Sequence, residues 1–173
     1  CNIGHSHPEV VKAVQEQAAK YMHLIVYGEF IESPQVQYAA LLASHLPENL
    51  DCVYFTSSGA EATEGALKLA KRVTGKTKII ACNKAYHGST QGALSVMGDE
   101  YWRNAFRPLL PEVYHFNYND DALVDAIDNT VACVIVEPVQ AESGVTPGRK
   151  EWLAQVRKKC DAHCVLLLFD EIQ

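Results

Sequence analysis

The sequence predicts an α/β fold in three layers (α/β/α), with a mainly parallel sheet between two layers of helices. First, apolar runs of strand length alternate with amphipathic runs of helical length from residue 47 onward. Second, residues 131–136 and 164–169 form unbroken apolar runs, as do strands that are buried on both faces of a parallel sheet. Third, carboxylates follow both runs directly, at the strand ends where open α/β sheets bind ligands.

Residues 1–46 are expected to form an N-terminal helical segment. Pro8 suits the first turn of a helix, and apolar residues recur at helical spacing after it. A second helix is expected over 34–46, because Pro47 cannot continue it. The remaining residues, 47–173, are expected to form the first part of a larger domain.

Strands and helices are expected to alternate through this larger domain. The expected strands are 51–56, 78–82, 113–116, 131–136 and 164–169. The expected helices are 60–73, 90–96, 121–127 and 150–162. After the fourth strand, Pro138 is expected to end the strand, and a loop returns through Gly144.

The composition limits the classes of partner. The net charge is −6 with an isoelectric point near 5.6, and no basic run occurs, which argues against binding to nucleic acid or to an anionic membrane. No apolar stretch approaches the roughly 20 residues that a membrane span needs. The first five residues resemble no signal peptide and contain no Met, as expected for a chain that begins within a longer protein. We therefore expect a cytoplasmic location.

The cysteines point to packing rather than to chemistry. Four of them lie in or beside apolar runs: Cys52, Cys82, Cys133 and Cys164. A free cysteine in such a run acts as a small apolar residue, so these four are expected to be buried and reduced. Cys160 and Cys164 flank His163, but no second ligand pair at a zinc spacing exists, so no metal site is expected.

Residues 57–62 join a strand to a helix and have two interpretations. The helix start offers free backbone N–H groups and a positive dipole end, and Gly59 would let an anion approach closely. The same residues fit an ordinary capping box, with Ser58 at the N-cap and Glu61 at the third helical position. These residues alone leave both interpretations open. The segment is neither a P-loop nor a GxGxxG fingerprint, which disfavours a nucleotide-binding oxidoreductase.

Three further strand ends carry groups that suit a binding site. Tyr86 follows the strand 78–82 and could stack on a flat ligand, or it could be an ordinary core residue. Glu137 follows the strand 131–136, where a carboxylate suggests a polar site, although solvated loop carboxylates are common. Asp170 follows the last strand. Together with the helix start, these groups suggest a ligand that is planar, cationic at one edge and phosphorylated at another.

Five motifs in this sequence resemble those of the class III (ω-type) aminotransferases, which are pyridoxal-phosphate enzymes of fold type I. They span nearly the whole chain in the family's order and are Gly4-His5-Ser6-His7-Pro8, Ser58-Gly59-Ala60-Glu61-Ala62, Tyr86-His87-Gly88, Glu137-Pro138-Val139-Gln140 and Asp170-Glu171-Ile172-Gln173. The set is more similar to acetylornithine, ornithine and 4-aminobutyrate aminotransferases than to the aspartate aminotransferase branch. The resemblance implies that residues 47–173 are the first part of the large domain that binds pyridoxal 5'-phosphate.

The resemblance also implies which residues hold this cofactor. Ser58, Gly59 and Ala60 would bind its phosphate at the helix start. Tyr86 would stack on the pyridine ring, and His87 would lie beside it.

Four later residues would complete the site. As a catalytic and cofactor-binding residue, Asp170 would pair with the pyridine nitrogen and keep it protonated. Gln173 would donate a hydrogen bond to the phenolic oxygen of the ring. Glu137 would be a catalytic residue on the substrate side, and Glu142 would match a family glutamate that pairs with an arginine further along the chain.

The sequence departs from the family pattern in three places. Ser57 stands where Asn is frequent, and Ala141 stands where Gly is usual. The family's Schiff-base lysine lies beyond the last motif, and no lysine before Gln173 matches its position. We therefore expect the C-terminal part with that lysine to be absent from this chain, and the chain alone to be inactive.

The resemblance implies an enzyme that transfers an amino group from an amino acid or an ornithine-like ω-amine to a 2-oxo acid such as 2-oxoglutarate. In the complete enzyme the missing lysine would act as the general acid and base of a ping-pong reaction. A homodimer is expected. Two alternatives stay open: a mutase or decarboxylase-like member of the same fold, and a non-catalytic chain that lacks the lysine.

Overall fold

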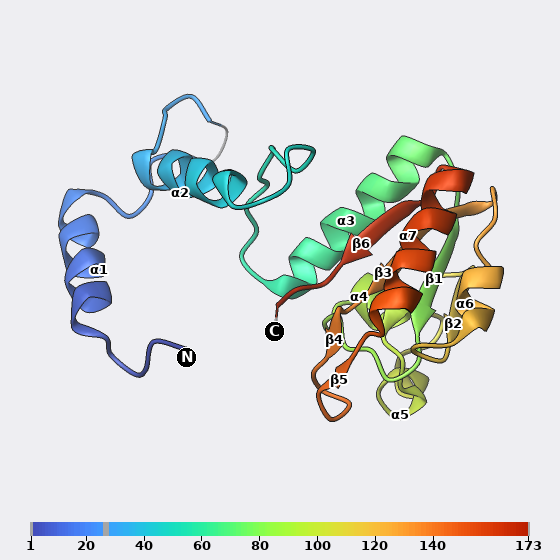
Figure 1. Cartoon of the computed structure of the whole chain (residues 1–173). Helices are drawn as coiled ribbons and strands as arrows, with labels where there is room; N and C mark the ends of the chain where they lie inside the picture. The colour runs from blue at the N-terminus through green and yellow to red at the C-terminus, as the bar shows by residue number, and fades with distance from the viewer. Residues whose placement is uncertain (1, 26–27, 173) are drawn as a thin grey trace. The chain divides into compact units, whose positions relative to one another are not determined.

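The computed structural model describes residues 2–25 and 28–172 (Figure 1). The chain forms two compact units, Cys1–Tyr54 and Phe55–Gln173, and each has its own elements. The first unit contains two helices, α1 (Pro8–Lys20) and α2 (Ser33–Ser44). Both begin with a proline in the first two positions, so the two helices expected here are confirmed.

No described residue of α1 or α2 is buried within the first unit. Glu32, at the N-cap of α2, accepts hydrogen bonds from the backbone N of Leu24 (3.2 Å) and from Nε2 of Gln35 (2.7 Å). The described residues of this unit therefore form no buried core of their own.

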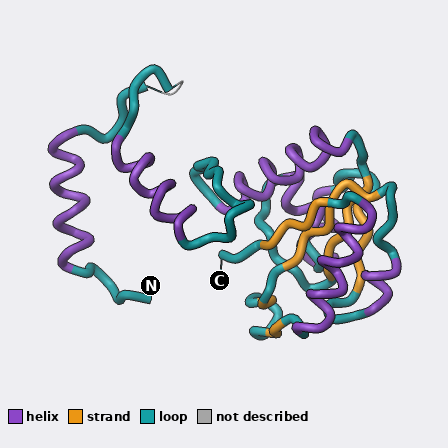
Figure 2. The backbone as a smooth tube through the Cα atoms, turned by 45° about the horizontal axis from the view of Figure 1, so that its top comes forward, coloured by secondary structure: helices purple, strands orange, loops and turns teal. Residues whose placement is uncertain are grey.

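The second unit is built on a four-stranded parallel sheet, whose strands run together in Figure 2. Its order is β2-β1-β3-β6, and every pairing is parallel. The strands are β1 (Lys78–Cys82), β2 (Val113–Phe116), β3 (Val131–Val136) and β6 (Leu166–Phe169). All six residues of β3 are buried, as the sequence predicts for 131–136.

Helices cover both faces of the sheet (Figure 1). They are α3 (Gly59–Thr74) and α4 (Gln91–Val96) on one face, and α6 (Asp121–Asp125) and α7 (Lys150–His163) on the other. Because successive strand residues point to opposite faces, Ile79 packs with Leu67 of α3, whereas Ile80 belongs to the cluster of Trp152 from α7. The expected three-layer arrangement is confirmed for this unit.

The register brings the carboxyl ends of the strands to one edge of the sheet. Cys82 of β1 is paired with Phe116 of β2, and Val136 of β3 is paired with Phe169 of β6. The backbone N of Asp170 donates to the carbonyl of Val136 at 2.9 Å, so the pairing continues one residue past the strand. The loops after β1, β3 and β6 therefore leave the sheet at the same edge.

The expectation that residues 164–169 are buried on both faces is wrong. In the described structure β6 is an edge strand that pairs with β3, with Leu166 to Leu168 half-buried and Phe169 exposed. The strand also begins later than expected, because Cys164 takes a left-handed conformation (φ 52°) where α7 ends. An apolar run indicates a strand, but it does not say whether a neighbour covers its outer edge.

The strand expected at 51–56 is absent from the described structure. Its apolar residues favour an extended chain, but a strand also needs a partner for its N–H and C=O groups. Within the described part of the chain, the segment 51–56 joins neither of the two sheets.

The loop expected after Pro138 contains a short antiparallel ribbon, β4 (Val139–Gln140) and β5 (Thr146–Pro147). The turn between them includes Gly144 with φ 103°, a conformation that favours glycine. Two further short elements, α5 (Glu100–Arg103) and the 3₁₀ helix η1 (Asn104–Phe106), were also not expected. The remaining expected helices and strands are present at or near their expected bounds.

The cysteines only partly follow the expectation. Cys82, Cys133 and Cys160 are buried, but Cys52 and Cys164 are exposed, so the prediction that these last two are buried is wrong. Cys52 lies in the segment 51–56, which forms no strand in the described structure, and Cys164 lies in the turn between α7 and β6. Whether a cysteine in an apolar run is buried depends on the residues that pack over it. In the described structure, Cys52 and Cys164 are not covered in this way.

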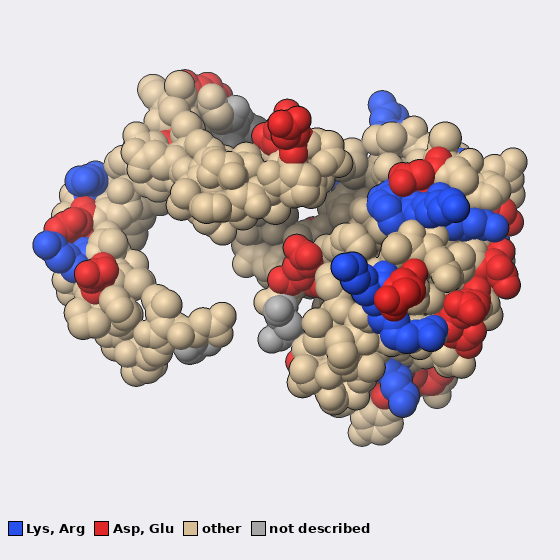
Figure 3. All heavy atoms as spheres, viewed as in Figure 1, with Lys and Arg blue, Asp and Glu red and all other residues tan. Residues whose placement is uncertain are grey.

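The charged side chains of the second unit are mixed in sign on the face shown in Figure 3, where basic groups lie among acidic ones. The ion pairs of this unit include Lys78 with Asp128 (3.5 Å) and Arg157 with Asp161. Among the described helices, none has the length and apolar character needed to span a lipid bilayer.

Candidate functional site

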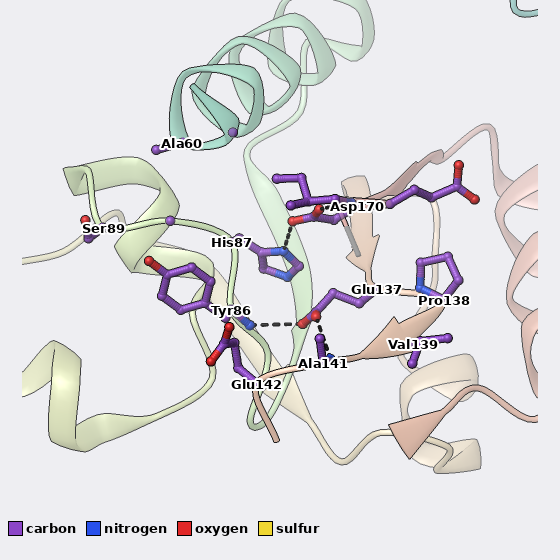
Figure 4. A pocket seen from close by; sticks show the side chains of 14 residues that line it. Ala60, Tyr86, His87, Ser89, Glu137, Pro138, Val139, Ala141, Glu142 and Asp170 are labelled. Atoms are coloured by element: carbon purple, nitrogen blue, oxygen red, sulfur yellow. Dashed lines mark hydrogen bonds and ion pairs between the residues drawn. The ribbon is translucent and has the colours of Figure 1, made fainter. Parts of the chain in front are cut away.

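A cavity of about 440 Å³ opens at the carboxyl edge of the sheet (Figure 4). Four segments line it: the start of α3, the loop after β1, the β3–β4 segment with the turn beyond it, and the residues after β6. These segments are far apart in the sequence, and the parallel register brings them together. The position agrees with the rule that open α/β sheets bind ligands at the carboxyl ends of their strands.

One hydrogen bond of the cavity joins the loops after β1 and β6. His87 is only 2 % exposed, and its Nδ1 lies 2.9 Å from Oδ2 of Asp170. An ionised carboxylate can only accept, so Nδ1 carries the proton of this hydrogen bond. The other ring nitrogen, Nε2, is buried without a hydrogen-bond partner among the described groups. The other carboxylate oxygen, Oδ1, accepts from the backbone N of Ile172 at 3.3 Å.

Tyr86 lines the cavity with a half-exposed side chain (45 %), whereas Glu137 is 5 % exposed. Both oxygens of Glu137 accept from backbone: Oε1 from the N of Tyr86 at 3.0 Å and Oε2 from the N of Ala141 at 3.3 Å (Figure 4). Backbone N–H donors satisfy a buried carboxylate without a counter-charge. Glu137 therefore holds the loop that carries Tyr86 against the segment that follows β4.

The side chain of Tyr118 also holds the backbone at Glu137 and Pro138. Its hydroxyl donates to the carbonyls of Glu137 (2.6 Å) and Pro138 (3.0 Å). Burial, with smaller contributions from Cys82 and Glu137, raises the pKa of Tyr118 to about 12, so the hydroxyl keeps its proton at neutral pH. A stable donor here fixes the backbone where β3 leaves the sheet.

The start of α3 combines both interpretations of its sequence. Oγ of Ser58 accepts from the N of Glu61 (3.2 Å), as in the expected capping box, whereas Oε2 of Glu61 accepts from the N of Ser57 (2.7 Å), one residue before the N-cap. Gly59 and Ala60 line the cavity, and as the first residues of the helix they have N–H groups without an intrahelical acceptor. The two interpretations are therefore compatible.

Seven of the residues singled out in the sequence line this one cavity: Gly59, Ala60, Tyr86, His87, Glu137, Glu142 and Asp170. Ser58 directly precedes the lining residues, and its hydroxyl oxygen is engaged in the helix cap. Gln173 lies outside the described residues.

Several lining residues were given no role in the sequence analysis, among them Gly88, Ser89 and Ile172. Gly88 has φ 117°, and a Cβ there would lie 2.7 Å from Cβ of Ala60, so the loop after Tyr86 contacts the first turn of α3 directly. Gly88 is the glycine of the third motif, but the sequence alone did not indicate that it contacts α3. Among the described residues, no group of three or more His, Cys, Asp or Glu side chains is arranged to hold a metal ion.

The cavity thus offers a helix N-terminus for an anion, an aromatic ring and a carboxylate oriented by a histidine. The model of the family Aminotransferase class-III matches residues 1–173. The chain belongs to this family. Class-III aminotransferases are enzymes that transfer amino groups, and the family expected from the sequence motifs is confirmed.

The relatives of this class-III aminotransferase chain include the acetylornithine aminotransferase of Methanopyrus kandleri, which is 45 % identical over 174 residues. The match covers 99 % of this chain but 44 % of that protein, so the chain spans less than half the length of its relative.

Two solved structures agree with the fold described above. An (S)-enantioselective ω-transaminase from Thermomicrobium roseum superposes with a TM-score of 0.90 at 28 % identity, covering 98 % of this chain and 44 % of the other. The ornithine aminotransferase of Toxoplasma gondii, a structure with partial occupancy of pyridoxal phosphate at its active site, superposes with a TM-score of 0.82 at 31 % identity. That match covers 98 % of this chain and 42 % of the other. The expected α/β fold is confirmed as part of a transaminase fold.

Proposed function

We propose that the cavity at the carboxyl edge of the sheet binds pyridoxal 5'-phosphate, and that the whole protein uses it to transfer an amino group from an amine to a 2-oxo acid. The observation that carries this proposal is the contact of His87 with Asp170 in the same cavity as the start of α3. Membership of the class-III aminotransferase family supports it.

The residues of the cavity fit the chemical groups of this cofactor. Its phosphate is an anion, and the N–H groups at Gly59 and Ala60 are suitable donors at the positive end of a 16-residue helix. Its pyridine ring is flat, and Tyr86 offers an aromatic face. Its ring nitrogen binds a proton, and Asp170 is the carboxylate that would face it. A volume of about 440 Å³ suits a ligand of this size.

Asp170, His87 and Tyr86 would each have a different role toward the bound cofactor. When bound, the cofactor acts as an electron sink for the substrate's reacting carbon. Asp170 would hold a proton on the ring nitrogen, since an anion beside a protonated nitrogen favours the charged form. His87 would keep Asp170 in place by donating from Nδ1. Tyr86 would cover one face of the ring and exclude water there.

The two glutamates would take different parts. Both oxygens of Glu137 already accept from backbone N–H groups, which supports a positioning role more than direct contact with the substrate. Glu142 lines the cavity beyond the ribbon strand β4, and we place it on the substrate side. Gln173 would reach the phenolic oxygen of the ring, as the resemblance implies.

The substrate class follows from the relatives. Acetylornithine and ornithine aminotransferases act on amines of the ornithine type, so we propose such a donor, with a 2-oxo acid such as 2-oxoglutarate as acceptor. We further propose that the lysine which binds the cofactor covalently lies in the part of the family fold that this chain does not span. A cytoplasmic homodimer completes the proposal.

The test uses the intact protein, mixed with pyridoxal phosphate and reduced with borohydride, and measured by intact mass. A stoichiometric adduct of one cofactor, together with glutamate formation from 2-oxoglutarate and N-acetylornithine or ornithine, is the expected result. Release of CO₂ without glutamate would favour a decarboxylase-like member instead. Absence of both an adduct and saturable cofactor binding would overturn the proposal.

A further inference from the structure

The short helix α4 is capped by a residue from another helix. Thr90 stands at its N-cap position but makes no cap hydrogen bond of its own. Its hydroxyl instead donates to Oε1 of Glu64 on α3, at 2.7 Å. The same oxygen accepts from the backbone N of Gly92 at 2.7 Å and from the N of Ala93 at 3.2 Å. Glu64 therefore satisfies the donors that a helix start leaves without partners.

The backbone before and within α4 fits closely against α3. A Cβ at Gly92 would lie 2.2 Å from Oε2 of Glu64. A Cβ at Gly88 would lie 2.7 Å from Cβ and 2.9 Å from Cα of Ala60. Gly88 therefore requires glycine, whereas a side chain at Gly92 would displace the carboxylate of Glu64. Figure 4 shows Ala60 at the start of α3 beside the loop of Tyr86, His87 and Ser89.

A buried hydrogen bond lies between these two contacts. The hydroxyl of Thr63 on α3 donates to the carbonyl of His87 at 3.0 Å, and Thr63 is itself buried. The segment 86–93 is thus held at three points: by Glu137 at the N of Tyr86, by Thr63 at His87, and by Glu64 at the start of α4. Two of these three points belong to α3, the helix whose first turn lines the cavity.

We propose that Glu64 is a positioning residue for the cofactor, which fixes the segment 86–93 against α3 so that Tyr86 and the start of α3 bind one ligand together. This inference rests on the proposed function. It concerns a residue that lies outside the cavity lining and acts through the loop that it caps.

The carboxylate of Glu64 is well suited to this task. Burial alone would raise its pKa, but hydrogen bonds from Thr90, Gly92 and Ala93, with the charge of Lys68, outweigh it and lower the pKa. The group is therefore ionised at neutral pH, where hydrogen bonds to a charged acceptor are the stronger kind. A loop anchored in this way needs no ordering when the ligand binds, which favours affinity.

The experiment compares Glu64→Ala, Glu64→Gln and the control Glu151→Ala in the intact protein. Glu151 is an exposed glutamate in the first turn of α7 and does not line the cavity. Two quantities are measured: amide hydrogen exchange of residues 88–93 without cofactor, and the Kd for pyridoxal phosphate by fluorescence titration. For Glu64→Ala we expect faster exchange at Gly92 and Ala93 and about tenfold weaker binding, the order expected when hydrogen bonds to one charged group are lost.

The Gln variant keeps an acceptor oxygen and should lie between Glu64→Ala and the wild type, while Glu151→Ala should match the wild type in both quantities. Faster exchange in Glu64→Ala with unchanged affinity would overturn the positioning role, because Glu64 would then stabilise the start of α4 without affecting cofactor binding. Unchanged exchange would overturn the cap itself. If Glu64→Ala does not fold, Thr63→Val against Thr63→Ser gives the same comparison at the neighbouring anchor. If the wild type binds no pyridoxal phosphate, the proposed function fails, whereas the exchange data still test the cap.

Discussion

Nδ1 of His87 lies 2.9 Å from Oδ2 of Asp170, although the two residues leave the sheet from strands that are not neighbours. His87 follows β1, Asp170 follows β6, and β3 lies between these strands. The contact therefore closes over the end of β3 and forms the buried wall of the cavity. It orients a carboxylate at the wall of the cavity.

Replacement of Asp170 by Ala should nearly abolish transamination and leave the fold intact. The loss of an oriented charge at the reacting group is worth roughly 100-fold or more in kcat. Steady-state kinetics of the intact protein measure this, and circular dichroism checks the fold. Asp161→Ala, at an exposed position on α7, is the control and should keep full activity. Near-normal turnover of Asp170→Ala would defeat the role assigned to this carboxylate.

Gly88→Ala should destabilise the protein, whereas Gly65→Ala on α3 should stabilise it. A Cβ at Gly88 meets Ala60 and also imposes a left-handed backbone on an alanine (φ 117°), at a cost of about 1–3 kcal/mol. Gly65 lies within a helix with nothing within 4 Å of an added Cβ, so alanine should add about 0.5–1 kcal/mol. Urea unfolding of both variants measures whether each substitution lowers or raises the free energy of unfolding. Equal effects would show that the close contact of Gly88 with α3 is absent in solution.

The contribution of Glu64 to stability should depend on pH in a defined direction. Its pKa in the folded state lies below the ordinary value of 4.5, so the stability it contributes is fully present above that value and is lost as pH falls through the folded-state pKa. Glu64→Gln should therefore be less stable than the wild type at neutral pH, and the difference should shrink as the pH falls below 4.5. Urea unfolding at several pH values measures this difference. A difference that does not change with pH would mean that the carboxylate's charge plays no part in the cap.

Thiol labelling should separate the described cysteines into two classes. Burial raises the pKa of Cys82 and Cys133 to about 12 and that of Cys160 to about 11, so these thiols should resist iodoacetamide in the native protein. Cys52 and Cys164 are exposed and should react. Peptide mass spectrometry of the native and the unfolded protein measures the extent of labelling at each cysteine. Rapid native labelling of Cys133, in the middle of β3, would contradict the buried sheet.

The amino-acid sequence by itself determined the elements that depend on local patterns. The apolar run 131–136 became the buried strand β3, and the capping residues Ser58 and Glu61 began α3 where expected. The motifs and their order also indicated the family by resemblance, and the family model that matches the chain confirms it.

Only the tertiary structure decided what depends on neighbours distant in the sequence. The run 51–56 formed no strand and β6 lay at an edge, because pairing and burial require a partner that an apolar run does not specify. The role of Glu64 was likewise hidden, because a glutamate on a helix surface carries no local sign that it caps another helix. The contact of His87 with Asp170 depends on the sheet order β1-β3-β6, which brings together two loops that the sequence separates.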